Sequence, residues 1–155
     1  MYNTCMKILV EDQLQHWVNR LGFVLRRDLQ DRFRRADMRL GAEEWAVLLL
    51  LWQDDGQTPG ELALRTVKDQ TTMTRLLDGL ARKGFVDRMR DHMDRRKVRV
   101  VLTPQGNEIQ GHLVPIAADL IKASEAGISD ADIQTTRRVL QKMTENLLET
   151  GGKNV

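Results

Sequence analysis

Residues 84–106, with the sequence GFVDRMRDHMDRRKVRVVLTPQG, constrain the fold of this chain more than any other segment. Two short strand-like runs, 85–90 and 97–102, flank a polar stretch that carries Asp94, Arg95 and Arg96. This pattern predicts a β-hairpin with a charged tip. Arginines at such a tip have no core to pack into, and the DNA minor groove is a narrow anionic groove that would bind them.

Helix signals precede the predicted hairpin. Thr58, Pro59 and Glu61 form the pattern of a capping box with proline at the first helical position, and Asp69 is placed to cap a following helix over 70–83. Before them, residues 41–54 predict a helix that is buried on nearly all sides. Helix, turn, helix and a basic hairpin follow one another in the order of a winged helix-turn-helix.

Longer helices are predicted on both sides of this segment. Apolar residues recur at helical spacing from 11 to 36, and two further helices are expected over 103–126, with a kink at Pro115, and from Ser129 to about 149. Their apolar stripes exceed what a small three-helix unit can cover, so we expect them to pair across a two-fold axis. The predicted fold is mainly α: a single domain over 1–155, with a winged helix-turn-helix at 41–102 and an α-helical dimerisation layer from 11–36 and 103–149.

Charge is distributed unevenly along the chain. The net charge of the 155 residues is only +2, but residues 58–102 carry eleven Lys and Arg against six Asp and Glu, whereas residues 103–155 carry five against seven. Positive charge therefore gathers on the predicted winged segment, where phosphate neutralisation would need it. One cysteine, a poor signal-peptide pattern at the N-terminus and no apolar run of roughly 20 residues favour a cytoplasmic protein.

Candidate DNA contacts fall at two places, the start of the helix over 70–83 and the hairpin tip. A helix entering the major groove presents its first turns to base edges. The alternatives are threonines that only cap a helix start, and exposed ion pairs at the tip that contribute almost nothing. The candidates are Gln70, Thr71, Thr72, Thr74, Arg75, Asp94, Arg95 and Arg96.

Catalytic and metal-binding patterns are absent from the sequence. His16, His92 and His112 lack the spacing of a zinc site, and there is no Gly-rich phosphate loop or GxSxG motif. We therefore expect no enzyme activity, no metal and no cofactor. Cys5 leaves a redox-sensing role open, although Lys7 is its only basic neighbour in sequence.

The residues from Trp45 to Gly106 resemble the MarR family of bacterial transcription regulators (multiple antibiotic resistance type). The resemblance lies in Trp45-x-Val47-Leu48, Asp55-Gly56, Glu61-Leu62-Ala63, Thr72-x-Thr74-Arg75, Lys83-Gly84-Phe85-Val86-x-Arg88, Asp91-x-x-Asp94-Arg95-Arg96 and Leu102-Thr103-x-x-Gly106. The wing motif DxxDRR followed by LTxxG is specific to this family. Gly41 departs from it, because a Thr often caps the second helix there.

The resemblance implies a homodimer that binds an inverted repeat in double-stranded DNA, with Arg96 entering the minor groove and held by Asp94. It also implies a small-molecule site between the dimer layer and the winged segment, for which the candidates are Trp17, Arg20, Val24, Trp45, Leu49 and His112. An apolar cleft with one arginine would suit an aromatic carboxylate or phenol, although these residues could equally be core. We thus expect a dimeric repressor of a palindromic operator, released by such a ligand. The alternatives are a winged-helix protein-interaction module that does not bind DNA, and a Cys5-based redox-sensing regulator.

Overall fold

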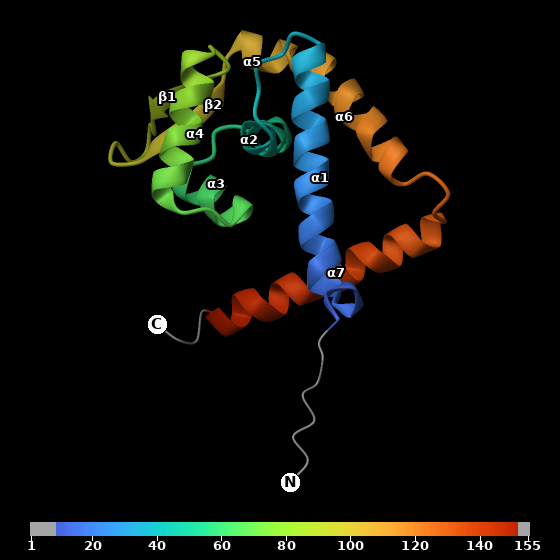
Figure 1. The fold of residues 1–155 in the computed structure, drawn as a ribbon. Coiled ribbons are helices and arrows are strands. Elements are labelled where there is room, and N and C mark those ends of the chain that lie inside the picture. The colour runs from blue at the N-terminus through green and yellow to red at the C-terminus, as the bar shows by residue number, and fades with distance from the viewer. Residues whose placement is uncertain (1–8, 152–155) are drawn as a thin grey trace. The chain divides into compact units, whose positions relative to one another are not determined.

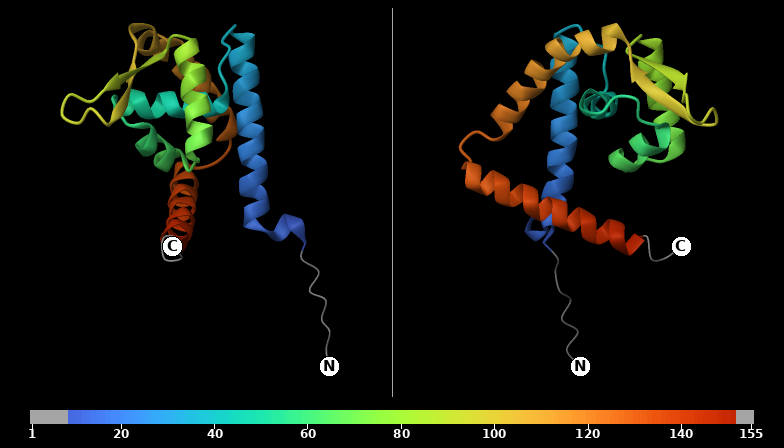
Figure 2. Two further views of the ribbon diagram at one scale, coloured as in Figure 1. Left: turned by 90° about the vertical axis from the view of Figure 1, so that its left-hand side faces the viewer. Right: turned by 180° about the vertical axis from the view of Figure 1, so that it is seen from behind.

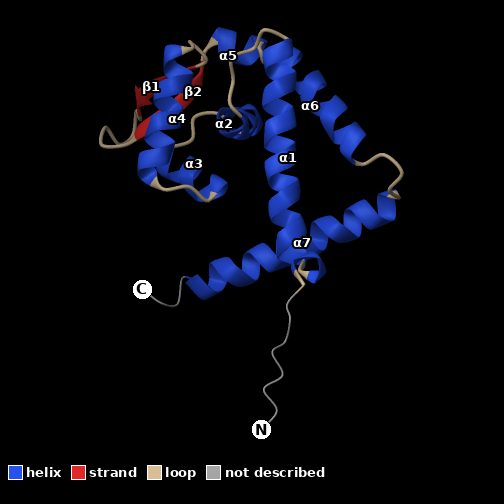
Figure 3. Ribbon diagram, viewed as in Figure 1, coloured by secondary structure: helices blue, strands red, loops and turns tan. Residues whose placement is uncertain are grey.

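The computed structural model describes residues 9–151, which form a mainly helical fold with one small antiparallel sheet (Figures 1 and 3). The expected mainly α winged-helix class is confirmed. The elements in chain order are a 3-10 helix (Val10–Asp12), α1 (Leu14–Arg35), α2 (Ala42–Gln53), α3 (Pro59–Thr66), α4 (Gln70–Arg82), β1 (Val86–Arg90), β2 (Val98–Leu102), α5 (Pro104–Glu108), α6 (Gln110–Ser124) and α7 (Asp130–Gly151).

The chain divides into two compact units, and the boundary between them falls between Leu120 and Ile121, within α6. The first unit contains everything from α1 to the larger part of α6. The second holds the end of α6 and α7, whose start is capped by Ser129, since its Oγ accepts from the N–H of Asp132. No helix among residues 9–151 combines the length and apolarity that a membrane crossing requires.

Helix α2 lies at the centre of the core of the first unit. Its sequence AEEWAVLLLLWQ is apolar on most sides, and Val47, Leu48 and Leu51 are almost completely buried. Trp45 packs between two other aromatic rings, with centroid distances of 5.5 Å to Phe33 and 5.6 Å to Trp52. The other large side chains that are fully buried are Phe33, Leu62, Met73, Leu77, Leu80, Val86, Val100 and Leu113.

The capping signals act as the sequence predicts. The backbone N–H of Glu61 donates to Thr58 Oγ1 at 3.2 Å, and the backbone N–H of Thr58 donates to Glu61 Oε2 at 2.8 Å. Helix α3 ends at Val67, whose φ of 53° places it in the left-handed region. Two residues later Asp69 starts α4, so the turn between the two helices is tight.

Strands β1 and β2 form the hairpin, with Val86 opposite Leu102 and Arg90 opposite Val98. Each strand begins one residue later than the predicted run. Val100 also pairs with Gln57 from the α2–α3 loop, which attaches the hairpin to the helices. Figure 2 shows the hairpin loop projecting beyond the helices that carry it.

The single kinked helix expected over 103–126 is wrong: two helices, α5 and α6, occupy this segment. The break lies at Ile109, and α6 continues through Pro115 (Figure 1). The short α5 is fixed to the end of α4, because Thr103 Oγ1 donates to the carbonyl of Gly84. Gly106 lies so close to this corner that a Cβ there would be 2.0 Å from the carbonyl oxygen of Phe85. These contacts attach the first turn of α5 to the base of the hairpin, and the chain changes direction after that turn.

Candidate nucleic-acid interface

Helix α4 buries one face and exposes the other. Met73, Leu76, Leu77 and Leu80 pack into the core. On the opposite face the side chains are polar, and the exposed ones at its start are Gln70, Thr71, Thr74 and Arg75. Thr72 is half-buried, and its backbone N–H donates to Asp69 Oδ1 at 2.7 Å. The helix therefore presents hydroxyls, an amide and a guanidinium, which are the groups that bind base edges and phosphates.

A shallow concave surface connects α4 to β1. It is lined by Thr71, Thr74, Arg75, Asp78, Ala81, Arg82 and Arg88. Arg88 Nη2 lies 2.7 Å from Asp78 Oδ1, so an ion pair joins the first strand to the middle of α4. Three arginines against one aspartate leave this surface net positive, as a surface that follows a phosphate backbone requires.

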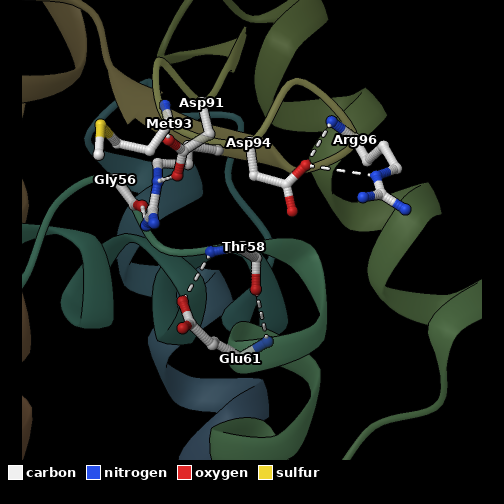
Figure 4. A network of polar contacts seen from close by, with 8 residues as sticks. Gly56, Thr58, Glu61, Asp91, Met93, Asp94 and Arg96 are labelled. Carbon is white, nitrogen blue, oxygen red and sulfur yellow. Dashed lines mark hydrogen bonds and ion pairs between the residues drawn. The ribbon is translucent and has the colours of Figure 1, made fainter.

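The hairpin tip carries two exposed arginines, Arg95 and Arg96. The backbone N–H of Arg96 donates to Asp94 Oδ1 at 3.0 Å, and Arg96 Nε lies 3.6 Å from the same oxygen (Figure 4). The Arg96 side chain is 95% exposed. An ion pair this exposed contributes little to stability. Its effect is on geometry, because Asp94 holds both the backbone and the side chain of Arg96.

The loop end of the hairpin is anchored by Arg99, which the sequence analysis did not single out. Its Nε donates to Asp91 Oδ2 at 2.6 Å and its Nη1 donates to the carbonyl of Gly56 at 2.9 Å. Arg99 thus ties the hairpin to the α2–α3 loop over a sequence separation of 43 residues.

Two residues of the α2–α3 loop complete the anchorage. Asp55 Oδ1 accepts the backbone N–H of Leu102 at 2.9 Å. Gln57 is buried, and its amide donates to the carbonyls of Leu50 and Asp54 while its oxygen accepts from Arg65. No local pattern reveals the contact of Asp55 with Leu102, because it joins segments 47 residues apart that only the fold brings together. The Asp55-Gly56 pair of the resemblance was the one available signal.

Hydrogen bonds from backbone and side-chain donors lower the pKa of two carboxylates of the interface, Asp69 and Asp91. The backbone N–H and then the hydroxyl of Thr72 hold the pKa of Asp69 below its ordinary value of 3.8. The backbone N–H of Met93 and then the guanidinium of Arg99 lower the pKa of Asp91 from the same value. Both groups stay ionised near neutral pH, where one caps α4 and the other anchors the hairpin.

The predicted ligand residues differ in their exposure. Trp45 lies in the core, Trp17, Arg20 and Val24 are exposed on α1, and Leu49 is exposed on α2. Of these residues, His112 lines a cleft of about 660 Å³ in the first unit. The other lining residues are Asp37, Met38, Arg39, Leu40, Lys83, Phe85, Gln105, Glu108 and Ile109. The six-residue site stays a prediction.

Metal and redox chemistry find few candidates. Within residues 9–151 no group of three His, Cys, Asp or Glu side chains is placed to hold a metal ion. Cys5 lies outside the described residues.

Known proteins are similar to this chain in sequence and in fold. Residues 40–98 match the family model described as "MarR family". Three curated relatives are similar: the HTH-type transcriptional repressor YetL of Bacillus subtilis (34% identical, 70% of this chain and 66% of the relative), the regulator SarZ of Staphylococcus epidermidis (30%, 68% and 71%) and the regulator TtmR of Methylorubrum extorquens (30%, 64% and 49%). The matched part thus spans between about half and two thirds of the length of TtmR and YetL.

Solved structures agree over nearly the whole chain. A MarR-family transcriptional regulator from Silicibacter pomeroyi has a TM-score of 0.75 at 29% identity and covers 90% of this chain and 92% of its own. BpsR of Bordetella bronchiseptica, described with the regulation of its DNA binding by 6-hydroxynicotinic acid, has a TM-score of 0.79 at 25% identity and covers 88% and 96%.

The fold and the interface define a winged helix-turn-helix protein. With the matches above, the chain belongs to the MarR family, a family of transcription regulators and not of enzymes.

Because Asp69 caps α4, the free energy of unfolding is expected to depend on pH in the acidic range. Because the folded state lowers the pKa of Asp69, its contribution is complete above the ordinary value of 3.8 and is lost as the pH falls through that range. Asp69→Asn keeps a capping oxygen that does not titrate. We therefore expect the free energy of unfolding, measured with urea between about pH 5 and pH 3, to fall less steeply in Asp69→Asn than in the wild type. Identical slopes would contradict the assignment.

Proposed function

We propose that this chain is a dimeric, sequence-specific DNA-binding repressor that binds an inverted repeat with α4 in the major groove and the hairpin tip in the minor groove. The observation that carries the proposal is the fixed relation between the polar face of α4 and Arg96. Arg88–Asp78 joins the hairpin to α4, and Arg99 joins it to the α2–α3 loop. A surface held this firmly can bind a rigid duplex without a large ordering cost.

Base contacts are proposed for Gln70, Thr71, Thr74 and Arg75 of α4, with Thr72 contributing at the helix start. Arg95 and Arg96 supply cations at the tip, and Asp94 orients Arg96. Arg82 and Arg88 extend the positive surface and suit phosphate contacts. In two copies related by a two-fold axis, two α4 helices spaced by one helical turn, about 34 Å, would match the two halves of an inverted repeat.

The proposal is tested by selecting duplexes from a random-sequence library and measuring their binding against salt concentration. We expect an inverted repeat to be enriched and binding to weaken steeply with salt. A winged-helix module that binds only proteins would select no sequence.

Arg96→Ala is expected to weaken binding to the selected operator by roughly 1–3 kcal/mol, because the tip loses its minor-groove cation. The thermal midpoint should not change, since the Arg96 side chain is 95% exposed. Arg27→Ala is the matched control: it removes the same charge from an exposed side chain of α1. Equal operator affinity of the two variants in a gel shift would refute the role of Arg96.

Dimerisation is proposed for the apolar side chains of α1 and α7. Leu147 and Leu148 of α7 are 76% and 55% exposed, and Trp17 and Leu21 of α1 are each 52% exposed. Apolar stripes of this kind mark protein–protein contacts. Spacings of three and four residues along α7 place Leu140, Met143 and Leu147 on one side of the helix.

Leu147→Lys should shift the protein toward monomers in light scattering, because the charge enters an apolar interface while the single chain loses little packing. Gln141→Lys adds the same charge at an exposed polar position of the same helix and should remain dimeric. A wild type that is monomeric at micromolar concentration would contradict the dimer and the inverted repeat together.

Release from DNA by a small aromatic acid or phenol is the proposed regulation. BpsR, a protein with this fold, is described with regulation by 6-hydroxynicotinic acid. In this chain, the cleft at His112 combines buried apolar side chains, Leu40 and Phe85, with two cations, Arg39 and Lys83, and two carboxylates, Asp37 and Glu108. Such a lining suits a small aromatic ligand with polar substituents. A ligand releases DNA only if it binds the DNA-free state more tightly.

Gel shifts with salicylate-like acids, and separately with peroxide, are expected to show release by an acid and not by oxidation. Cys5→Ser should leave the response unchanged. Loss of the response in Arg39→Ala would locate the ligand in the cleft, and its loss in Arg20→Ala would locate it at the predicted six residues. Peroxide release that disappears in Cys5→Ser, without any response to acids, would make the chain a redox sensor.

A further inference from the structure

The first turn of α2 carries two neighbouring glutamates whose partners lie at opposite ends of α4. Glu43 Oε1 accepts from Lys68 Nζ at 2.8 Å, and Lys68 immediately precedes the N-cap of α4. Glu44 Oε2 accepts from Lys83 Nζ, and Lys83 is the C-cap residue of α4. One turn of the central core helix is therefore bound to both ends of the proposed recognition helix.

Both ion pairs are partly removed from water. The Lys68 and Glu44 side chains are 18% and 13% exposed. Lys68 lowers the pKa of Glu43 through its hydrogen bond, and Arg26 and Arg75 add weaker attraction. Pairs of this kind contribute less to net stability than to fixing one geometry, because breaking them leaves a poorly solvated charge.

Glu44 has a second fixed contact. Its Oε2 also accepts the backbone N–H of Gly41, the N-cap residue of α2, at 3.2 Å. The carboxylate thus joins the start of α2 to the end of α4 through one oxygen atom.

Gly79 makes room for this carboxylate. Gly79 is buried in α4, and a Cβ at this position would lie 2.6 Å from Glu44 Oε1. Glycine is a poor helix residue, costing up to about 1 kcal/mol relative to alanine. Its φ is ordinary, so the backbone does not require glycine here. A side chain at this position would instead displace the Glu44 carboxylate from where it lies.

We propose that Glu43 and Glu44 are positioning residues that set the orientation of α4 relative to the core and thereby determine the DNA-sequence specificity of this protein. The proposal rests on the proposed DNA binding. It extends that function to two acidic residues that face the core side of α4 and would not touch DNA.

The charge change in the glutamine variants separates a positioning role from a general electrostatic effect on DNA affinity. Replacing a glutamate with glutamine makes the protein more positive, and general electrostatics then predicts equal or tighter binding to any duplex. Loss of positioning predicts the opposite for the selected operator only. The measured quantity is therefore the ratio of affinities for the selected operator and for a scrambled duplex at one salt concentration.

Glu44→Gln keeps an acceptor for the Gly41 N–H, since glutamine also serves in a capping box, but loses the ionic bond to Lys83. We expect the affinity ratio to fall about tenfold in Glu43→Gln and in Glu44→Gln. Glu145→Gln is the charge-matched control on α7, where the side chain is exposed. Its ratio should equal that of the wild type.

Gly79→Ala separates positioning from stability. The added methyl group displaces the Glu44 carboxylate while alanine favours the helix, so the thermal midpoint should stay equal or rise as the affinity ratio falls. Gly22→Ala in α1, where a Cβ would meet nothing within 4 Å, is the control and should leave the ratio unchanged.

The proposal is overturned if the wild type selects an operator and the three variants keep the affinity ratio of the Glu145→Gln control. These variants are Glu43→Gln, Glu44→Gln and Gly79→Ala. A wild type that selects none would overturn the proposed function itself. If the glutamine variants unfold, the Gly79→Ala ratio decides: a fall supports positioning, and an unchanged ratio overturns it.

Discussion

Burial of α2 is the constraint on which the first unit depends. Its apolar residues Val47, Leu48 and Leu51 leave almost no surface to solvent. Fully burying a side chain of this size stabilises the fold by roughly 1.5–3 kcal/mol. Because α2 is apolar on most sides, other elements must surround it, and α1, α3, α4 and β2 each contact it. The hairpin and the proposed recognition helix therefore share one rigid support.

Polar contacts add orientation to this apolar support. Exposed pairs such as Asp94–Arg96 contribute little free energy, yet they restrict an arginine that would otherwise sample many rotamers. The partly buried pairs of Lys68 and Lys83 with the start of α2 hold the ends of α4. The arrangement suits a protein that must match the spacing and the grooves of a duplex, for which a change in helix direction matters more than a small change in stability.

Local signals predicted most of the fold. The capping box at Thr58, the cap at Asp69 and the alternating runs of the hairpin depend on neighbours within a few residues, so the sequence alone reveals them. The prediction of one helix over 103–126 failed because the start of this segment is attached to the hairpin base. Thr103 Oγ1 donates to the carbonyl of Gly84, and Gly106 lies against the carbonyl of Phe85. A proline is a visible signal of a break, whereas a tertiary attachment is not.

The candidate site divides in the same way. The exposed face of α4 and the arginines of the tip follow from helical spacing and from a hairpin that has no core to fill, so the sequence by itself determined which side chains face outward. Only the tertiary structure decided what holds them: Arg99 and Gly56 are 43 residues apart in the sequence, and Glu44 and Lys83 are 39 residues apart. It also placed Trp45 in the core and left Arg20 exposed. Spacing along a chain fixes which face a residue occupies, but the partner on that face is chosen by packing, which no local pattern contains.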